Sequence, residues 1–122
     1  MMMNRFAYAA AFALAATIAA APAPAQTLIG KGDAFLLGGE QRVPMRVVGR
    51  NTGRVPVEVM AETRGKRRAI GIVAPGGRFD QVFAAGEIAV LRNTSNVQQA
   101  AVKIELNRQL FNLSMRYQLP QD

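Results

Sequence analysis

The side chains that could catalyse a reaction in this chain are few, and their spacing matches no known catalytic arrangement. There is no histidine and no cysteine among the 122 residues, which excludes Ser-His-Asp triads, Cys-His pairs, disulfides and cysteine-based zinc sites. Glu58 and Glu62 share one face of a predicted strand, where they would lie about 13 Å apart. Because the two carboxyl groups of a glycosidase lie closer together, we interpret both as solvated, outward-facing carboxylates.

Cofactor and metal sites are not indicated either. Gly30-Lys31-Gly32 and Gly38-Gly39 lack the spacing of a phosphate-binding loop, and no Asp-x-Asp pattern supplies calcium ligands. Lys66 and Lys103 could act as bases only beside a serine, and the sequence places no serine beside either. We therefore predict a protein that is not an enzyme and that uses no cofactor and no metal.

The chemistry that the sequence does offer is that of exposed cations. Fifteen Lys and Arg residues against eight Asp and Glu residues give a net charge of +7. The candidate anion- or partner-binding residues form one series over 42–54 and a second over 64–68, namely Arg42, Arg46, Arg50, Arg54, Arg64, Lys66, Arg67 and Arg68. The two series would meet if their strands were neighbours, and such a patch attracts polymers that carry phosphate or carboxylate groups.

Two interpretations of these cations stay open at the level of sequence. The first is the anion-binding surface. The second is a solvated edge strand, because outward-facing arginines with Pro44 in the same strand are typical of an edge protected against pairing. Sequence-specific nucleic-acid recognition is not favoured, since the Phe residues occupy core-like positions and leave no aromatic side chains between the cations.

The elements that must position the cations are strands. Residues 42–50 and 55–62 alternate between apolar side chains and other side chains, with the period of two expected of a strand. Turn-forming residues follow or separate such runs at 51–53, 63–66, 75–77 and 93–96. Arg-Asn-Thr occurs at 50–52 and again at 92–94, which we interpret as a chance recurrence at two turns.

Further strands are expected over 27–37, 69–74, 79–83 and 88–91. The segment 96–119 is ambiguous, because Ser95 followed by Gln98 resembles a helix capping box. The strand pattern fits better and predicts one strand over 100–106 and another over 111–119. The apolar face of the second strand would consist of Phe111, Leu113, Met115, Tyr117 and Leu119.

Seven or eight short strands, with turn signals about every 8–12 residues, predict an all-β protein. We expect a small immunoglobulin-like β-sandwich, with a jelly roll or a small barrel as the alternative.

The N-terminal region has the features of a secretory signal peptide. A charged start at Arg5 precedes an uncharged, Ala-rich run over 6–21 and the small-x-small sequence Ala23-Pro24-Ala25. We predict cleavage of residues 1–25, leaving a single domain over 26–122 with no membrane span. Because an exported chain without cysteine must fold without disulfides, we expect the periplasm or cell surface of a Gram-negative bacterium.

Two functions fit these features. The first is a non-enzymatic, exported envelope or surface module that binds another envelope or surface protein, for example by adding a strand at a sheet edge. The second is a binder of anionic glycan, lipopolysaccharide or another polyanion through the basic residues.

Overall fold

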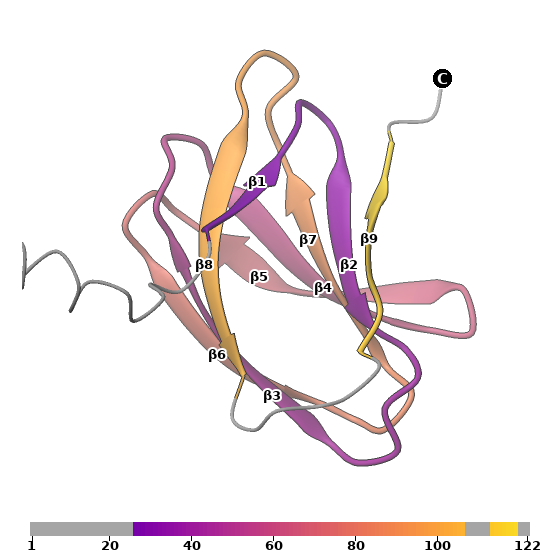
Figure 1. Ribbon diagram of the computed structural model, residues 1–122. Helices are drawn as coiled ribbons and strands as arrows, with labels where there is room; N and C mark the ends of the chain where they lie inside the picture. The colour runs from indigo at the N-terminus through magenta and orange to yellow at the C-terminus, as the bar shows by residue number, and fades with distance from the viewer. Residues whose placement is uncertain (1–25, 107–112, 120–122) are drawn as a thin grey trace, which may run out of the picture.

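The computed structural model describes residues 26–106 and 113–119, and in these ranges the protein is built from nine strands with no helix. The all-β prediction is confirmed for this part of the chain (Figure 1). The strands are β1 (Gln26–Ile29), β2 (Ala34–Gly38), β3 (Met45–Asn51), β4 (Val57–Thr63), β5 (Lys66–Val73), β6 (Arg78–Phe83), β7 (Ile88–Asn93), β8 (Ala100–Leu106) and β9 (Met115–Gln118). The signal peptide predicted for residues 1–25 lies outside the described residues.

The strand count of seven or eight is too low for a specific reason. The segment 27–37, predicted as one strand, is divided into β1 and β2 by a tight turn in which the Asp33 N–H donates to the Gly30 carbonyl. The two halves then join different sheets, because β1 pairs with β8 and β2 pairs with β7 and β9.

The strands form two antiparallel sheets whose apolar faces share one core, an arrangement consistent with a β-sandwich (Figure 1). The four-stranded sheet has the order β1-β8-β3-β6, and the five-stranded sheet has the order β5-β4-β7-β2-β9. Val47 and Phe83 from the first sheet, and Leu37 and Leu91 from the second, are fully buried between them. This burial of apolar area is the main favourable contribution to folding in a chain without disulfides.

Strand β3 confirms the predicted alternation but not the predicted edge position. Its residues alternate between buried and more exposed side chains, with Arg46 and Arg50 exposed on the outer face. However, β3 lies between β8 and β6, so interpreting the 42–50 segment as an edge strand is wrong. Pro44 immediately precedes the strand, where its missing N–H removes no hydrogen bond from the ladder.

Two buried asparagines stabilise turns at which the chain crosses from one sheet to the other. Asn51 ends β3 and Asn93 ends β7, and each side chain is at most 1% exposed. The Asn51 Nδ2 donates to the carbonyls of Val55 and Val73, at 2.8 and 2.9 Å. The Gly53 N–H donates to the Asn51 Oδ1 at 3.0 Å, which closes the turn that follows β3.

Asn93 has the same function in the five-stranded sheet. Its Nδ2 donates to the carbonyls of Ile29, Gly30 and Gln98, at 3.1, 3.0 and 2.8 Å. Its Oδ1 accepts the Ser95 N–H at 2.8 Å. The asparagine of each Arg-Asn-Thr sequence therefore has the same structural role at a sheet crossing, which the interpretation as a chance recurrence did not anticipate.

The segment 96–119 contains strands in its described part, as the alternation predicted, with β8 and β9 in place of a helix. Phe111 lies outside the described residues. Met115 and Tyr117 pair with Leu37 and Phe35 and so lie on the core side, yet they are 61% and 53% exposed. The reason is that β9 is an edge strand, and the described residues leave a hollow of about 180 Å³ between β1–β8 and β2–β9.

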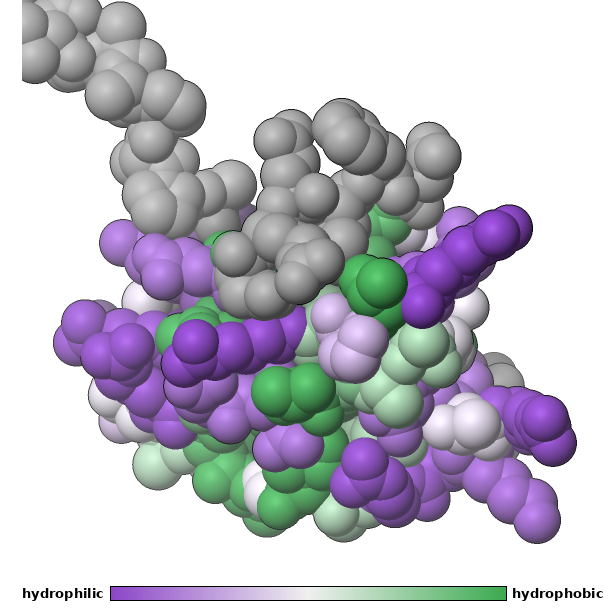
Figure 2. Space-filling model, turned by 90° about the horizontal axis from the view of Figure 1, so that it is seen from below, coloured by the Kyte–Doolittle hydropathy of each residue, from purple (hydrophilic) through white to green (hydrophobic). Residues whose placement is uncertain are grey.

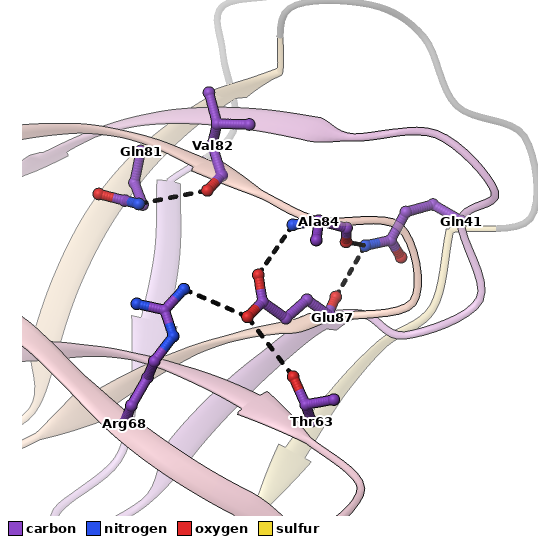
Figure 3. A network of polar contacts seen from close by, with 7 residues as sticks. All are labelled: Gln41, Thr63, Arg68, Gln81, Val82, Ala84 and Glu87. Atoms are coloured by element: carbon purple, nitrogen blue, oxygen red, sulfur yellow. Dashed lines mark hydrogen bonds and ion pairs between the residues drawn. The ribbon is translucent and has the colours of Figure 1, made fainter.

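One end of the sandwich is fastened by a polar network around Glu87, in the connection between β6 and β7 (Figure 3). The buried Glu87 carboxylate accepts the Ala84 N–H at 2.8 Å, Arg68 Nη2 at 3.2 Å and Thr63 Oγ1 at 3.4 Å. From the β2–β3 connection, Gln41 Nε2 donates to the carbonyls of Ala84 and Glu87, at 3.1 and 2.7 Å. The β2–β3 connection, the β6–β7 connection and the β4–β5 hairpin, which are distant in sequence, are thereby held together.

The surface at this end is mixed in character. Figure 2 views the molecule from below and shows hydrophobic surface near the middle, with hydrophilic side chains projecting on both sides. Val43 in the β2–β3 connection and Val82 near the end of β6 are 38% and 54% exposed. Isolated apolar side chains of this kind are normal on protein surfaces and do not by themselves define a site.

Candidate functional site

All eight basic residues singled out from the sequence are exposed, but the structure does not bring them together. Arg46 and Arg50 lie on the outer face of the four-stranded sheet, while residues 64–68 form the β4–β5 hairpin of the other sheet. The neighbours of β3 are β6 and β8, so the condition under which the two series would meet is not fulfilled. Arg42 and Arg54 lie in the connections before and after β3.

In the hairpin, Arg67 and Arg68 on β5 are engaged with protein acceptors. Arg67 Nε lies 2.7 Å from a Glu62 carboxylate oxygen, and its Nη2 also donates to the Gln118 side chain on β9. Arg68 pairs with Glu87 at 3.2 Å. Such pairing leaves these side chains less available to an external anion than their exposure suggests.

The strand register instead gathers a different set of cations on the four-stranded sheet. Arg50 on β3 lies directly opposite Arg78 on β6, and on its other side directly opposite Lys103 on β8. The three side chains are exposed, and we call them the cation row. Since adjacent strands lie about 5 Å apart, the row is about 10 Å long and runs across the strands. In the described part of the chain, no ion pair involves any of the three.

The cation row borders a shallow hollow of about 230 Å³. Besides the three cations, the hollow is lined by Val48, Gly49 and Glu105. Val48 and Glu105 are paired across β3 and β8, one step along the strands from the row. The site therefore combines three positive charges with an apolar patch and one carboxylate.

The same face also carries an ion pair in which the charges of Arg46 and Asp80 compensate each other. Arg46 on β3 donates from Nε to the Asp80 carboxylate on β6 at 2.8 Å, and its Nη2 donates to the other oxygen. The hydrogen bonds from Arg46 lower the pKa of Asp80; the charges of Arg46 and Arg78 act in the same direction, and desolvation opposes them. Asp80 therefore stays ionised and bound to Arg46 at neutral pH.

Sequence reasoning missed Arg78 and Lys103, although their outward direction was readable. Arg78 is in phase with Asp80 in the alternating 79–83 segment, and Lys103 is in phase with Glu105. Each alternation gives the face of a residue but not the identity of its cross-strand neighbour. The register between the strands is therefore needed to place either residue beside Arg50.

The outer face of the five-stranded sheet carries a larger but weaker candidate. A hollow of about 440 Å³ is lined by charged and small residues, namely Gly32, Ala34, Glu62, Gly65, Arg67, Arg92, Gln118 and Leu119. Its arginines are compensated, since Arg67 pairs with Glu62 and Arg92 pairs with Glu58 at 2.8 Å. It therefore offers an anion less uncompensated charge than the cation row.

Within residues 26–106 and 113–119, no group of acidic side chains could hold a metal ion. The same ranges contain no helix that is long and apolar enough to cross a membrane. Comparisons with protein-family models, with curated proteins and with solved structures find no match.

Proposed function

We propose that the protein is a non-enzymatic, exported binding module with an immunoglobulin-like sandwich, and that its four-stranded sheet binds an anionic partner of the cell envelope or surface. The cation row carries this proposal: Arg50, Arg78 and Lys103 are exposed, directly in register on three adjacent strands, and outside every ion pair of the described residues. Guanidinium and ammonium groups in such an array match the oxygens of carboxylate, sulfate or phosphate groups.

The row is better explained by binding than by protection of an edge. Like charges directly opposite each other on neighbouring strands destabilise a sheet, and here two such contacts are adjacent. Protection against edge pairing would need only the outermost strands to be charged, whereas β3 and β8 are inner strands. An anionic partner would neutralise these charges, so binding would relieve an electrostatic repulsion that destabilises the free protein.

The chemistry of the remaining side chains supports a non-enzymatic function. With no histidine and no cysteine in the sequence, the chain has no imidazole base and no thiol nucleophile. Four carboxylates, those of Glu58, Glu62, Asp80 and Glu87, are engaged in ion pairs with arginines. These carboxylates act in the structure as partners for cations, which suits a scaffold better than a general acid or base.

Neutralising the cation row tests the proposal. We expect the combined variant Arg50→Gln, Arg78→Gln and Lys103→Gln to bind immobilised polygalacturonate about tenfold more weakly or worse. Because exposed charges are screened by salt, the binding of the unaltered protein should also fall steeply between about 0.05 and 0.2 M salt. Biolayer interferometry at several salt concentrations measures both effects.

A variant of equal charge separates the site from the overall charge of the protein. Arg42→Gln, Arg54→Gln and Arg64→Gln remove the same three charges from exposed positions outside the row. This control should keep most of the binding, with circular dichroism confirming that both variants are folded. Equal losses in the two variants would show attraction by net charge alone and would rule out the proposed site.

Export makes a separate prediction about the N-terminus. In a Gram-negative expression host, the protein recovered from the periplasm should begin at Gln26, as measured by intact-mass spectrometry. The physical reason is that signal peptidase accepts small residues such as Ala23 and Ala25 before the cleavage point. Recovery of the uncleaved chain in the membrane fraction would instead show that residues 1–25 act as an anchor.

A further inference from the structure

The proposed function leaves the chemical class of the anion open, and the surroundings of the cation row restrict it. We infer that the row binds an acidic polysaccharide whose carboxylates are separated by uncharged sugar atoms, and that it discriminates against polyanions with closely spaced charges. The inference rests on the proposed function and deepens it. It follows from what borders the row on each side.

The row is only one residue wide. One step along the strands in one direction, the outer face carries Asp80, Val48 and Glu105, so two of the three positions are acidic. One step in the other direction it carries the neutral residues Ala101 and Leu28, which are paired on β8 and β1. The positive surface is therefore a narrow strip across the sheet, and a ligand that is charged along its whole width would extend beyond it.

Glu105 is the residue that makes this narrow strip selective among anionic ligands. Asp80 is bound by Arg46, but Glu105 forms no ion pair among the described residues and lines the same hollow as Arg50 and Lys103. A phosphate chain lying in the hollow would place further negative charge against the Glu105 carboxylate. Such repulsion is an established way to reject one ligand in favour of another.

The same carboxylate suits a sugar. Sugar hydroxyl groups donate hydrogen bonds, and Glu105 offers acceptor oxygens beside the cations. Val48, which lies between Asp80 and Glu105 on the outer face, supplies an apolar contact for the carbon-bound hydrogens of a sugar ring. At the β1 end of the row, Gln26 Nε2 donates to Thr52 Oγ1 at 2.7 Å, which places further polar groups next to Lys103.

Single-stranded nucleic acid is the alternative ligand that the face fits poorly. Proteins that bind single strands stack the bases on exposed aromatic side chains. The described outward positions of the four-stranded sheet carry no aromatic residue; they are Gln26, Leu28, Arg46, Val48, Arg50, Arg78, Asp80, Val82, Ala101, Lys103 and Glu105. A nucleic acid would thus meet the repulsion of Glu105 without the compensating stacking.

The test compares four probes at one salt concentration: polygalacturonate, polyglutamate, inorganic polyphosphate and single-stranded DNA. The unaltered protein should bind polygalacturonate most tightly. Glu105→Gln should shift the ratio of affinities toward polyphosphate by about fivefold, the effect of about 1 kcal/mol for a unit like charge at roughly 4 Å in water. Glu40→Gln, which removes an exposed carboxylate outside this face, should leave the ratio unchanged.

The outcomes separate this inference from the proposed function. If polyphosphate or DNA binds at least as tightly as polygalacturonate, or if Glu105→Gln leaves the ratio unchanged, the inference is overturned while an anion-binding row remains. Tighter binding of polyglutamate would overturn it in favour of an acidic protein partner. If none of the four probes binds, the proposed function fails as well.

Discussion

Asn93→Ala is expected to lower the free energy of unfolding by about 3–5 kcal/mol, because buried polar groups that lose their partner cost about 1–3 kcal/mol each. The fully buried Asn93 side chain bonds three carbonyls and one N–H, from segments on both sides of the sheet crossing. Since a domain of this size is stable by only about 5–15 kcal/mol, the loss would be a large part of the total.

Asn51→Ala is expected to have a similar but smaller effect, because Asn51 makes three such bonds rather than four. Urea denaturation followed by circular dichroism measures both variants. Thr52→Ala is the matched control: Thr52 is exposed, and among the described residues its hydroxyl accepts only from Gln26, so the change should stay within about 0.5 kcal/mol.

Asn93→Asp distinguishes the donor role of the side chain from its volume. The carboxylate keeps the shape and the acceptor for Ser95, but it cannot donate to the three carbonyls and would place a negative charge against them. We expect it to be at least as destabilising as alanine. If Asn93→Ala cost less than about 1 kcal/mol, water would be replacing the side chain, and the crossing would not depend on it.

The alternation of the sequence was sufficient to predict local structure on the four-stranded sheet. It placed Arg46 and Arg50 on an outward face, because successive side chains of a strand point to opposite sides. What it could not supply was the register, which is formed between segments far apart in the chain. Arg78 and Lys103 flank Arg50 only because β6 and β8 pair with β3, and no local pattern encodes that choice.

The exposure of the apolar face of β9 could not be predicted, for a related reason. The side of the strand on which Met115 and Tyr117 lie was predicted correctly, and the Phe35 and Tyr117 rings are in contact with centroids 5.3 Å apart. Whether that side is buried depends on the opposite sheet, which does not enclose β9 completely. The period of the sequence alternation indicates to which side of the sheet a side chain points. Its exposure depends on how two sheets of different width overlap.

Gly49→Ala is expected to destabilise the protein by about 3 kcal/mol, because it overfills a closely packed contact beneath the cation row. A Cβ atom at Gly49 would lie 2.2 and 2.3 Å from the Cε1 and Cζ atoms of the Phe79 ring, which is the residue directly opposite on β6. The ring must move or the two strands must separate. Since Arg50 and Arg78 are the next pair along the same ladder, their spacing should change and binding to polygalacturonate should weaken.

Gly71→Ala supplies the control within a strand, because nothing lies within 4 Å of a Cβ placed there. Its backbone does not have the positive φ that favours glycine, so we expect a neutral change or a gain of up to about 1 kcal/mol. In the double variant Gly49→Ala with Phe79→Ala, the steric conflict disappears, and the combined loss should be smaller than the sum of the single losses. Additive losses would mean that the Phe79 ring is not what requires glycine at position 49, and that the spacing of the cation row does not depend on this contact.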